Sequence, residues 1–182
     1  MGEEKVLMNA KQIEEAINTI SNSIMKEFGD ISHVAIVGIQ TRGVEIAKRI
    51  KKHLETSSGK EIKMGTLDIT FYRDDLATRG VLPAIKETTI TFNITKKNII
   101  LVDDVLFTGR TIKAALETLM SFGRPQVIRL AVLVDRGNRE LPIQPDYCGM
   151  KIKTKIGDKV KVRLKETDGI EDTVLYYPMI YD

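Results

Sequence analysis

Apolar residues recur at helical spacing in three stretches of the chain. In the first, they line one face of an expected helix: Ile13, Ala16, Ile17, Ile20 and Ile24. Asn9 and Gln12 have the capping-box spacing of a helix start, so we expect this helix to begin there and to run to about Lys26. Further helices are expected from about Gly43 to His53 and from Thr111 to Phe122.

Short runs rich in β-branched residues separate these helices and predict strands. The runs are His33–Ile39, Ile62–Phe71, Thr89–Ile94, Asn98–Val102 and Val127–Val134. Several are apolar at every position, which is typical of strands buried on both faces of a sheet. Because strands and helices alternate, we expect an α/β fold with a central, mainly parallel sheet flanked by helices.

The pattern changes beyond Asp135, where Pro and Gly interrupt the chain and Val160–Leu164 alternates apolar and basic positions. We expect residues from about 135 to 182 to form a small antiparallel hood over the sheet, within a single domain of residues 1–182. The polar connection 72–88 is longer than most loops of compact domains, and such loops are usually functional or disordered.

The composition is that of a globular protein, with 42% hydrophobic and 29% charged residues among 182. No apolar stretch is long enough to span a membrane, and the acidic N-terminus does not resemble a secretory signal, so we expect a cytoplasmic protein. The single cysteine, Cys148, excludes an internal disulfide, and we assign it a structural role. The net charge of +3 is compatible with an anionic ligand or with weak attraction to nucleic acid.

One segment, ILVDDVLFTGRT at Ile100–Thr111, combines a buried strand, two carboxylates and a Thr-Gly-Arg-Thr turn that opens a helix. Ligands of open α/β sheets bind at the carboxyl ends of strands, where Asp103 and Asp104 are expected. The backbone N–H groups at a helix start bind phosphate, and Gly109 allows a close approach to the backbone. The segment therefore predicts a phosphate site beside a pair of acidic acceptors.

The acidic pair has more than one interpretation. Asp103 and Asp104 could ligate a metal or accept hydrogen bonds from two neighbouring sugar hydroxyls, whereas a single Asp after a strand often only caps the next helix. A cap requires neither the second carboxylate nor Gly109, so we favour a ligand site. The chain has no GxxxxGK[ST] or GxGxxG motif, so neither a Walker-type nucleoside triphosphatase nor a dinucleotide-binding fold is indicated.

The segment VDDVLFTGRT resembles the 5-phosphoribosyl-1-diphosphate signature of type I phosphoribosyltransferases. Four more segments resemble the PyrR family of bifunctional pyrimidine operon attenuators and uracil phosphoribosyltransferases, in the same order and spacing: MNAKQIEEAI, VGIQTRG, LDITFYRDDL and LVDRGNRELPI. The resemblance covers nearly the whole chain. It implies the type I phosphoribosyltransferase fold, conversion of uracil and 5-phosphoribosyl-1-diphosphate to UMP and diphosphate, and Mg²⁺ as cofactor.

The resemblance also implies roles for individual residues. Arg42 would be the cation of a diphosphate loop with a non-proline cis peptide near Gln40-Thr41, although a simple turn with a surface arginine would have the same residues. Asp103 and Asp104 would hold the ribose 2- and 3-hydroxyls, directly or through Mg²⁺, and would bind the metal directly or through ribose or water. The residues implied to bind 5-phosphoribosyl-1-diphosphate are Thr41, Arg42, Gly43, Asp103, Asp104, Val105, Leu106, Phe107, Thr108, Gly109, Arg110 and Thr111.

Arg73 is implied as the catalytic cation of a mobile lid, about residues 72–88, although a solvated charged loop would look the same. The residues implied to frame the base are Val134, Asp135, Arg136 and Val160. Arg136 could instead be a structural salt-bridge partner. Purine-using relatives carry an acidic residue where this chain has Phe107, and an aromatic ring cannot accept a proton. We therefore expect no general base in this loop, and a reaction that depends on stabilising the leaving group.

The family also implies binding of a stem-loop in pyrimidine-operon messenger RNA when uridine nucleotides such as UMP or UTP are present. RNA binding requires gathered cations, but the first helix carries Glu14 and Glu15. The remaining candidates could equally form a solvated face, and the two arginines could instead be structural salt-bridge partners: Arg136, Arg139, Lys151, Lys153 and Lys155. We expect RNA regulation to be retained but weak or altered.

Two alternatives to a uracil-using enzyme stay open at this point. One is an RNA-binding regulator whose transferase pocket only senses nucleotide. The other is a transferase for hypoxanthine or guanine, which Phe107 disfavours. Relatives pair, so a homodimer or a higher homo-oligomer is expected.

Overall fold

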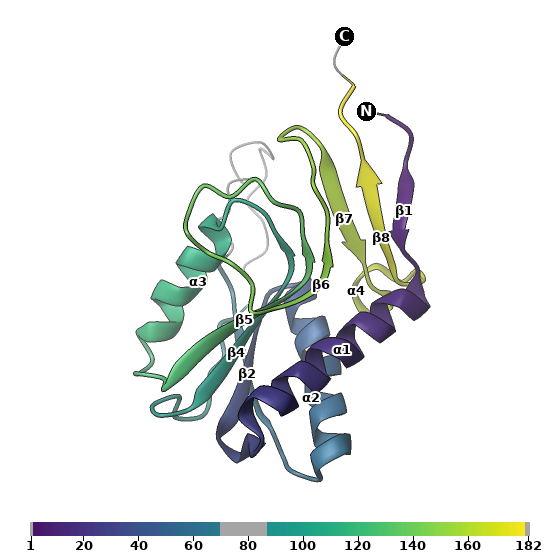
Figure 1. The fold of residues 1–182 in the computed structure, drawn as a ribbon. Helices are drawn as coiled ribbons and strands as arrows, with labels where there is room; N and C mark the ends of the chain where they lie inside the picture. Colours follow the sequence, from purple (N-terminus) through teal and green to yellow (C-terminus); the bar gives the residue numbers. More distant parts are fainter. Residues whose placement is uncertain (1, 70–86, 181–182) are drawn as a thin grey trace.

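A parallel sheet forms the centre of the computed structural model, which describes residues 2–69 and 87–180. Its five strands lie in the order β3-β2-β4-β5-β6 and run parallel throughout (Figure 1). The strands are β2 (Val34–Ile39), β3 (Lys63–Leu67), β4 (Asn98–Leu106), β5 (Val127–Asp135) and β6 (Tyr147–Lys151). The prediction of a parallel α/β sheet is confirmed.

Helices cover both faces of this sheet. The helices α1 (Ala10–Phe28) and α2 (Arg42–Ser58) lie on one face, and α3 (Arg110–Met120) lies on the other (Figure 1). The capping box at the start of α1 is present as predicted: Asn9 accepts a hydrogen bond from the Gln12 amide, and Gln12 accepts one from the Asn9 amide, both at 2.9 Å. A turn of 3-10 helix, η1 (Ile31–His33), precedes β2, so His33 lies just outside the strand predicted to contain it.

Alternate residues of the central strands enter two different cores. In β4, Ile100 and Val102 pack with α1 and α2, whereas Ile99 and Leu101 pack on the α3 side. All four side chains are completely buried. This is the two-sided burial that a continuous apolar run indicates, and each such side chain contributes roughly 1.5–3 kcal/mol to folding.

The antiparallel hood takes its strands from both ends of the chain. It consists of β1 (Lys5–Met8), β8 (Thr173–Tyr177) and β7 (Lys159–Arg163) in that order, with the short helix α4 (Lys165–Asp168) before β8. The two chain ends therefore lie side by side (Figure 1). The expected hood boundary at about residue 135 does not match this arrangement, because β6 pairs with β5 and belongs to the central sheet.

The strand predicted at Thr89–Ile94 is wrong. Only Thr89 pairs, in an isolated antiparallel bridge whose two backbone hydrogen bonds to Thr66 are both 2.9 Å long. The chain then turns at Lys96, which has a positive φ of 62°, to enter β4. The apolar pattern reflects packing of Ile94, which is completely buried on the α3 side, rather than a continuous strand.

The expected lid falls almost wholly outside the described residues, and so does Arg73. Within residues 2–69 and 87–180, no helix has the length and apolar character needed to cross a membrane.

Candidate active site

The loop between β2 and α2 begins with the cis peptide bond Gln40-Thr41, which confirms that part of the prediction. The Gln40 amide donates to the carbonyl of Leu67 at 2.8 Å, so the loop is tied to the end of β3. Arg42 is the first residue of α2. The loop therefore lies at the carboxyl ends of the strands, where its amides and the positive end of the α2 dipole can attract an anion.

Gly43 brings this loop into direct contact with the end of β4. A Cβ atom at this position would lie 2.6 Å from the Val102 carbonyl oxygen and 3.1 Å from Asp103 Cα, both far closer than ordinary contacts. Only glycine allows the start of α2 to pack this tightly on the strand. As a result, two segments that are distant in sequence meet at one point: the Arg42 loop and the acidic pair.

The acidic pair belongs to β4 itself, because the strand runs to Leu106 rather than ending at Val102 as predicted. Asp103 is buried, with 6% of its surface exposed, and Asp104 is half-buried. Asp103 Oδ1 accepts a hydrogen bond from the Asp104 amide, and Asp104 Oδ1 accepts one from the Val105 amide, both at 2.8 Å. These contacts hold both carboxylates against the backbone of β4, with Asp103 beside the Gly43 contact.

The turn after β4 forms the start of α3. Gly109 precedes the helix with a φ of +94°, a conformation that favours glycine. The Thr108 carbonyl accepts a hydrogen bond from the Glu140 amide at 2.9 Å, and Arg110 Nε donates to Glu140 at 2.6 Å. With Thr111 half-buried in the first turn, the four residues expected to receive a phosphate surround one helix N-terminus.

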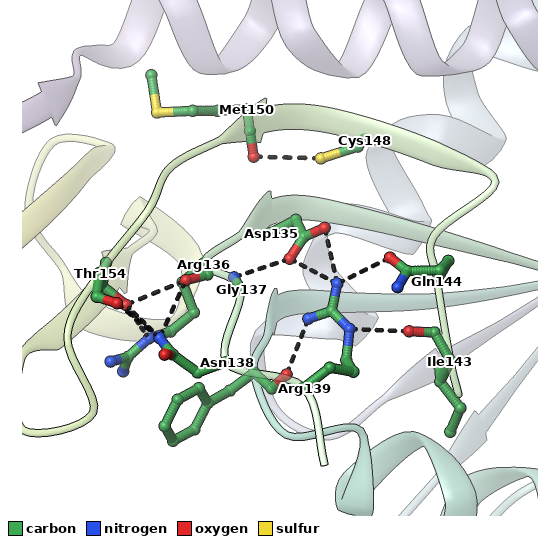
Figure 2. Close-up of polar contacts among 11 residues, drawn as sticks. Asp135, Arg136, Gly137, Asn138, Arg139, Ile143, Gln144, Cys148, Met150 and Thr154 are labelled. Carbon is green, nitrogen blue, oxygen red and sulfur yellow. Dashed lines mark hydrogen bonds and ion pairs between the residues drawn. The ribbon is translucent and has the colours of Figure 1, made fainter. Parts of the chain in front are cut away.

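Arg139 organises the segment after β5, and Figure 2 shows its contacts. Arg139 Nη2 donates to both carboxylate oxygens of Asp135 at 2.8 Å, Nε donates to the Ile143 carbonyl at 2.8 Å, and Nη1 donates to the Phe107 carbonyl at 2.8 Å. Only 13% of the Arg139 side chain is exposed. This geometry favours the salt-bridge alternative for Arg139 over a place on an exposed RNA surface.

Arg136 is also held by structural partners. It is 7% exposed, and its guanidinium carbon lies 4.0 Å from the centre of the Phe107 ring. Its Nε donates to the Thr154 hydroxyl at 3.1 Å, and its Nη2 donates to the carbonyls of Asp158 at 2.9 Å and Lys155 at 3.2 Å (Figure 2 shows the Thr154 contact). Burial lowers the pKa of the guanidinium. The side chain thus joins the Phe107 loop to the connection between β6 and β7.

The remaining candidates are spread over the molecule. Val134 is completely buried in the core on the α1 and α2 side, and Val160 is half-buried against that same core. Lys151 and Lys153 are exposed at and just beyond the end of β6, and Lys155 is exposed further along the same connection. The residues expected to bind diphosphate, ribose and the 5-phosphate thus lie together at the carboxyl ends of the parallel strands. Asp135 and Arg136 lie at the same end of the sheet, at and just after the end of β5.

One contact of the site was not anticipated from the sequence. Arg42 donates to the carboxylate of Asp168, the last residue of α4, through Nη2 at 2.6 Å and Nε at 3.2 Å. Burial by itself would raise the pKa of Asp168, but the hydrogen bonds from Arg42 and the Leu164 amide outweigh it and lower that pKa. The acidic composition of the KETDGIED segment was the available signal, although it does not specify a partner.

Comparison with known proteins agrees with this geometry. The family model described as a phosphoribosyl transferase domain matches residues 5–167, so the fold and the match together define a phosphoribosyltransferase. Curated relatives named bifunctional protein PyrR narrow the assignment. The relative from Chloroflexus aurantiacus is 46% identical and covers 96% of each chain, and that from Thermus thermophilus is 49% identical and covers 92% of each. The chain belongs to the PyrR family of phosphoribosyltransferases.

Solved structures agree on the fold. A hypoxanthine phosphoribosyltransferase of Trypanosoma cruzi superposes with a TM-score of 0.71 at 15% identity, covering 96% of this chain and 97% of that one. A hypoxanthine-guanine phosphoribosyltransferase of Bacillus anthracis gives a TM-score of 0.69 at 16% identity, covering 97% and 99%. At this level of identity the likeness concerns the fold alone.

Proposed function

We propose that this phosphoribosyltransferase uses uracil, converting it with 5-phosphoribosyl-1-diphosphate to UMP and diphosphate. The observation that carries the proposal is the Gly43 contact, which joins the Arg42 loop to the acidic pair of β4. A substrate with a diphosphate on one carbon of a sugar and two hydroxyls beside it needs a cationic loop and paired acceptors side by side. Membership of the PyrR family supports uracil as the base.

In this proposal each segment binds one part of the substrate. Thr41, Arg42 and the amides at the start of α2 receive the diphosphate. Asp103 and Asp104 accept hydrogen bonds from the ribose hydroxyls, and the turn 108–111 receives the 5-phosphate. The bond from the sugar C1 to the diphosphate oxygen breaks, the oxygen keeps the electron pair, and the C1–N1 bond to uracil forms as N1 loses its proton to the departing diphosphate or to water.

Mg²⁺ fits this site as an ion held largely by the substrate. Mg²⁺ is usually bound in proteins by one or two carboxylates together with phosphate oxygens and water. Asp103 and Asp104 provide such a pair, and no group of three or more metal-binding side chains occurs in the described part of the chain. When bound, the ion would neutralise charge on the leaving diphosphate.

Phe107 gives the loop after β4 no proton acceptor, so we propose that rate depends on stabilising the leaving group. Arg42→Ala should then reduce turnover strongly, by roughly 100-fold for the loss of a cation at developing charge. Phe107→Ala should retain turnover. The opposite pattern, with Phe107→Ala inactive and Arg42→Ala active, would contradict the assignment. Arg73 stays a predicted lid cation.

The base is tested directly by supplying uracil, hypoxanthine and guanine in parallel, with diphosphate release as the readout. Release with uracil and Mg²⁺, and its loss when a chelator is added, is the expected result. Release with hypoxanthine or guanine instead would replace the proposal with purine transfer. Binding of UMP without release for any base would favour the nucleotide-sensing regulator.

A second proposed function is RNA-dependent attenuation, which the bifunctional relatives support. The exposed lysines at and beyond the end of β6, Lys151, Lys153 and Lys155, are the proposed cations for it, whereas α1 presents Glu14 and Glu15 to solvent. We therefore propose weak or altered binding of the pyrimidine-operon leader. A gel-shift titration with UMP present at moderate salt tests this, and absence of a shift would remove the proposal. Light scattering of the same sample would test the proposed homodimer or higher homo-oligomer.

A further inference from the structure

Arg42 is not an isolated cation at the start of α2. Both of its contacts within the described part of the chain go to Asp168, 126 residues later, and they use Nε and Nη2 in a side-by-side pair. This is the planar, two-point geometry that fixes the orientation of a guanidinium. The third nitrogen, Nη1, has no partner within residues 2–69 and 87–180 and can donate to a ligand.

Asp168 is itself fixed in place. Its Oδ2 also accepts a hydrogen bond from the Leu164 amide at 2.8 Å, and its own amide donates to the Leu164 carbonyl at 2.7 Å. The Asp168 side chain is 17% exposed and that of Arg42 is 29% exposed, so water screens the pair only partly. The carboxylate is thus a rigid partner for Arg42.

A second ion pair anchors α4 on α2. Arg49 lies two helical turns after Arg42, hence on the same face of α2. It donates to Asp172 at 2.5 and 3.1 Å and to Glu166 at 3.0 and 2.6 Å. The hood is therefore held on α2 at two arginines, and the Arg49 contacts are independent of Asp168.

We propose that Asp168 is a positioning residue that holds the Arg42 guanidinium ready for the leaving diphosphate. This inference rests on the proposed binding of diphosphate at the Arg42 loop. An arginine side chain without such a partner samples several rotamers and must be ordered when the anion binds. With Asp168 in place, that ordering has occurred during folding, so diphosphate meets a cation already oriented.

Asp168 could instead weaken diphosphate binding. A carboxylate beside Arg42 also cancels part of the positive charge that would attract diphosphate. If that effect were larger, removing Asp168 would strengthen diphosphate binding. The two effects therefore predict changes in opposite directions, and one binding measurement separates them.

The experiment is calorimetric titration of the full chain with inorganic diphosphate and Mg²⁺, comparing Asp168→Asn with the matched control Asp172→Asn. Both variants remove one hood carboxylate from an arginine of α2, but only the first touches Arg42. We expect Asp168→Asn to weaken diphosphate binding by roughly 10- to 100-fold, as for misplacement of a catalytic group, and Asp172→Asn to leave it unchanged. Asp168→Glu should restore part of the affinity.

Steady-state kinetics add a readout that a merely structural role would not move. Asp168→Asn should raise the KM for 5-phosphoribosyl-1-diphosphate and lower kcat while leaving the KM for uracil in place. In an Arg42→Gln background, Asp168→Asn should cause no further loss, because it acts through Arg42. Unchanged or tighter diphosphate binding in Asp168→Asn, equal losses in the two Asn variants, or additive losses with Arg42→Gln would each overturn the inference.

Failure of the proposed function would look different. A wild-type chain that binds diphosphate but transfers ribosyl phosphate to no base would refute the function, while the calorimetric comparison would still decide the role of Asp168. A wild-type chain that binds no diphosphate would overturn both.

Discussion

Gly43→Ala is the most direct test of the contact that unites the site. The added methyl group would lie 2.6 Å from the Val102 carbonyl oxygen, so the start of α2 must retreat by roughly 0.8 Å to restore an ordinary contact near 3.4 Å. Overpacking of this kind costs about 1–3 kcal/mol of unfolding free energy. Because Arg42 precedes Gly43, the same retreat moves the cation away from the acidic pair.

The chain offers a matched control in Gly149→Ala. A Cβ atom at Gly149 would also lie 2.6 Å from a carbonyl oxygen, that of Leu133, but in the contact between β6 and β5. Both variants should therefore lose about 1–3 kcal/mol in urea unfolding. Only Gly43→Ala should also lose diphosphate affinity and turnover, by roughly 10- to 100-fold, since a displacement near 1 Å can cost that much in an organised site.

Urea unfolding measures the stability of the two variants. Calorimetry measures their diphosphate affinity, and diphosphate release measures their turnover. Wild-type kinetics in Gly43→Ala would refute the idea that the close contact places Arg42. Equal losses of turnover in both variants would show that general destabilisation, rather than the position of the loop, explains the effect.

The remaining predictions concern stability. Arg136→Met should cost roughly 2–4 kcal/mol in urea unfolding, because it removes the donor to the buried Asp158 carbonyl and to the Thr154 hydroxyl, whereas exposed Lys151→Met should change little. Asn9→Ala should cost about 1 kcal/mol through loss of the α1 cap, measured in the same way. For Asp172, burial opposes ionisation, but the hydrogen bonds from Arg49 and the Lys165 amide outweigh it and lower the pKa below its ordinary 3.8. This contribution is complete above pH 3.8 and is lost as pH falls through the folded pKa, so between pH 7 and pH 3 wild type should lose more stability than Asp172→Asn. An equal loss in both would contradict the ion-pair assignment.

The central sheet could be predicted because its signals are local. The β4 run is apolar at successive positions, and the capping box of α1 needs only Asn9 and Gln12. Several elements with weak local signals were not predicted, among them β6 and β1. The edge strand β6 contains Gly149 and no β-branched residue, and β1 acquires its structure by pairing with β8 near the other end of the chain. The apolar run at Thr89–Ile94 led to the prediction of a strand that is not present, because burial there does not come from strand pairing.

The candidate site also contains one part that local sequence predicts and another part that it does not. The acidic pair and the turn at Gly109 lie in one continuous segment, so a strand, a carboxylate pair and a helix start could be identified together. The partners of the arginines could not be, because they come from other segments: Asp168 for Arg42, and the carbonyls of Lys155 and Asp158 for Arg136.

This division has a physical cause that bears on function. A phosphate site at a helix N-terminus uses backbone amides, which the local fold orients without help from distant residues. A diphosphate site that uses a guanidinium depends on a flexible side chain, and such a side chain is oriented only by a partner that the tertiary fold delivers. In this chain that partner, Asp168, belongs to a hood whose sheet is completed by the N-terminal strand β1. Strands from the two ends of the chain thus complete the hood that carries Asp168, the carboxylate paired with Arg42.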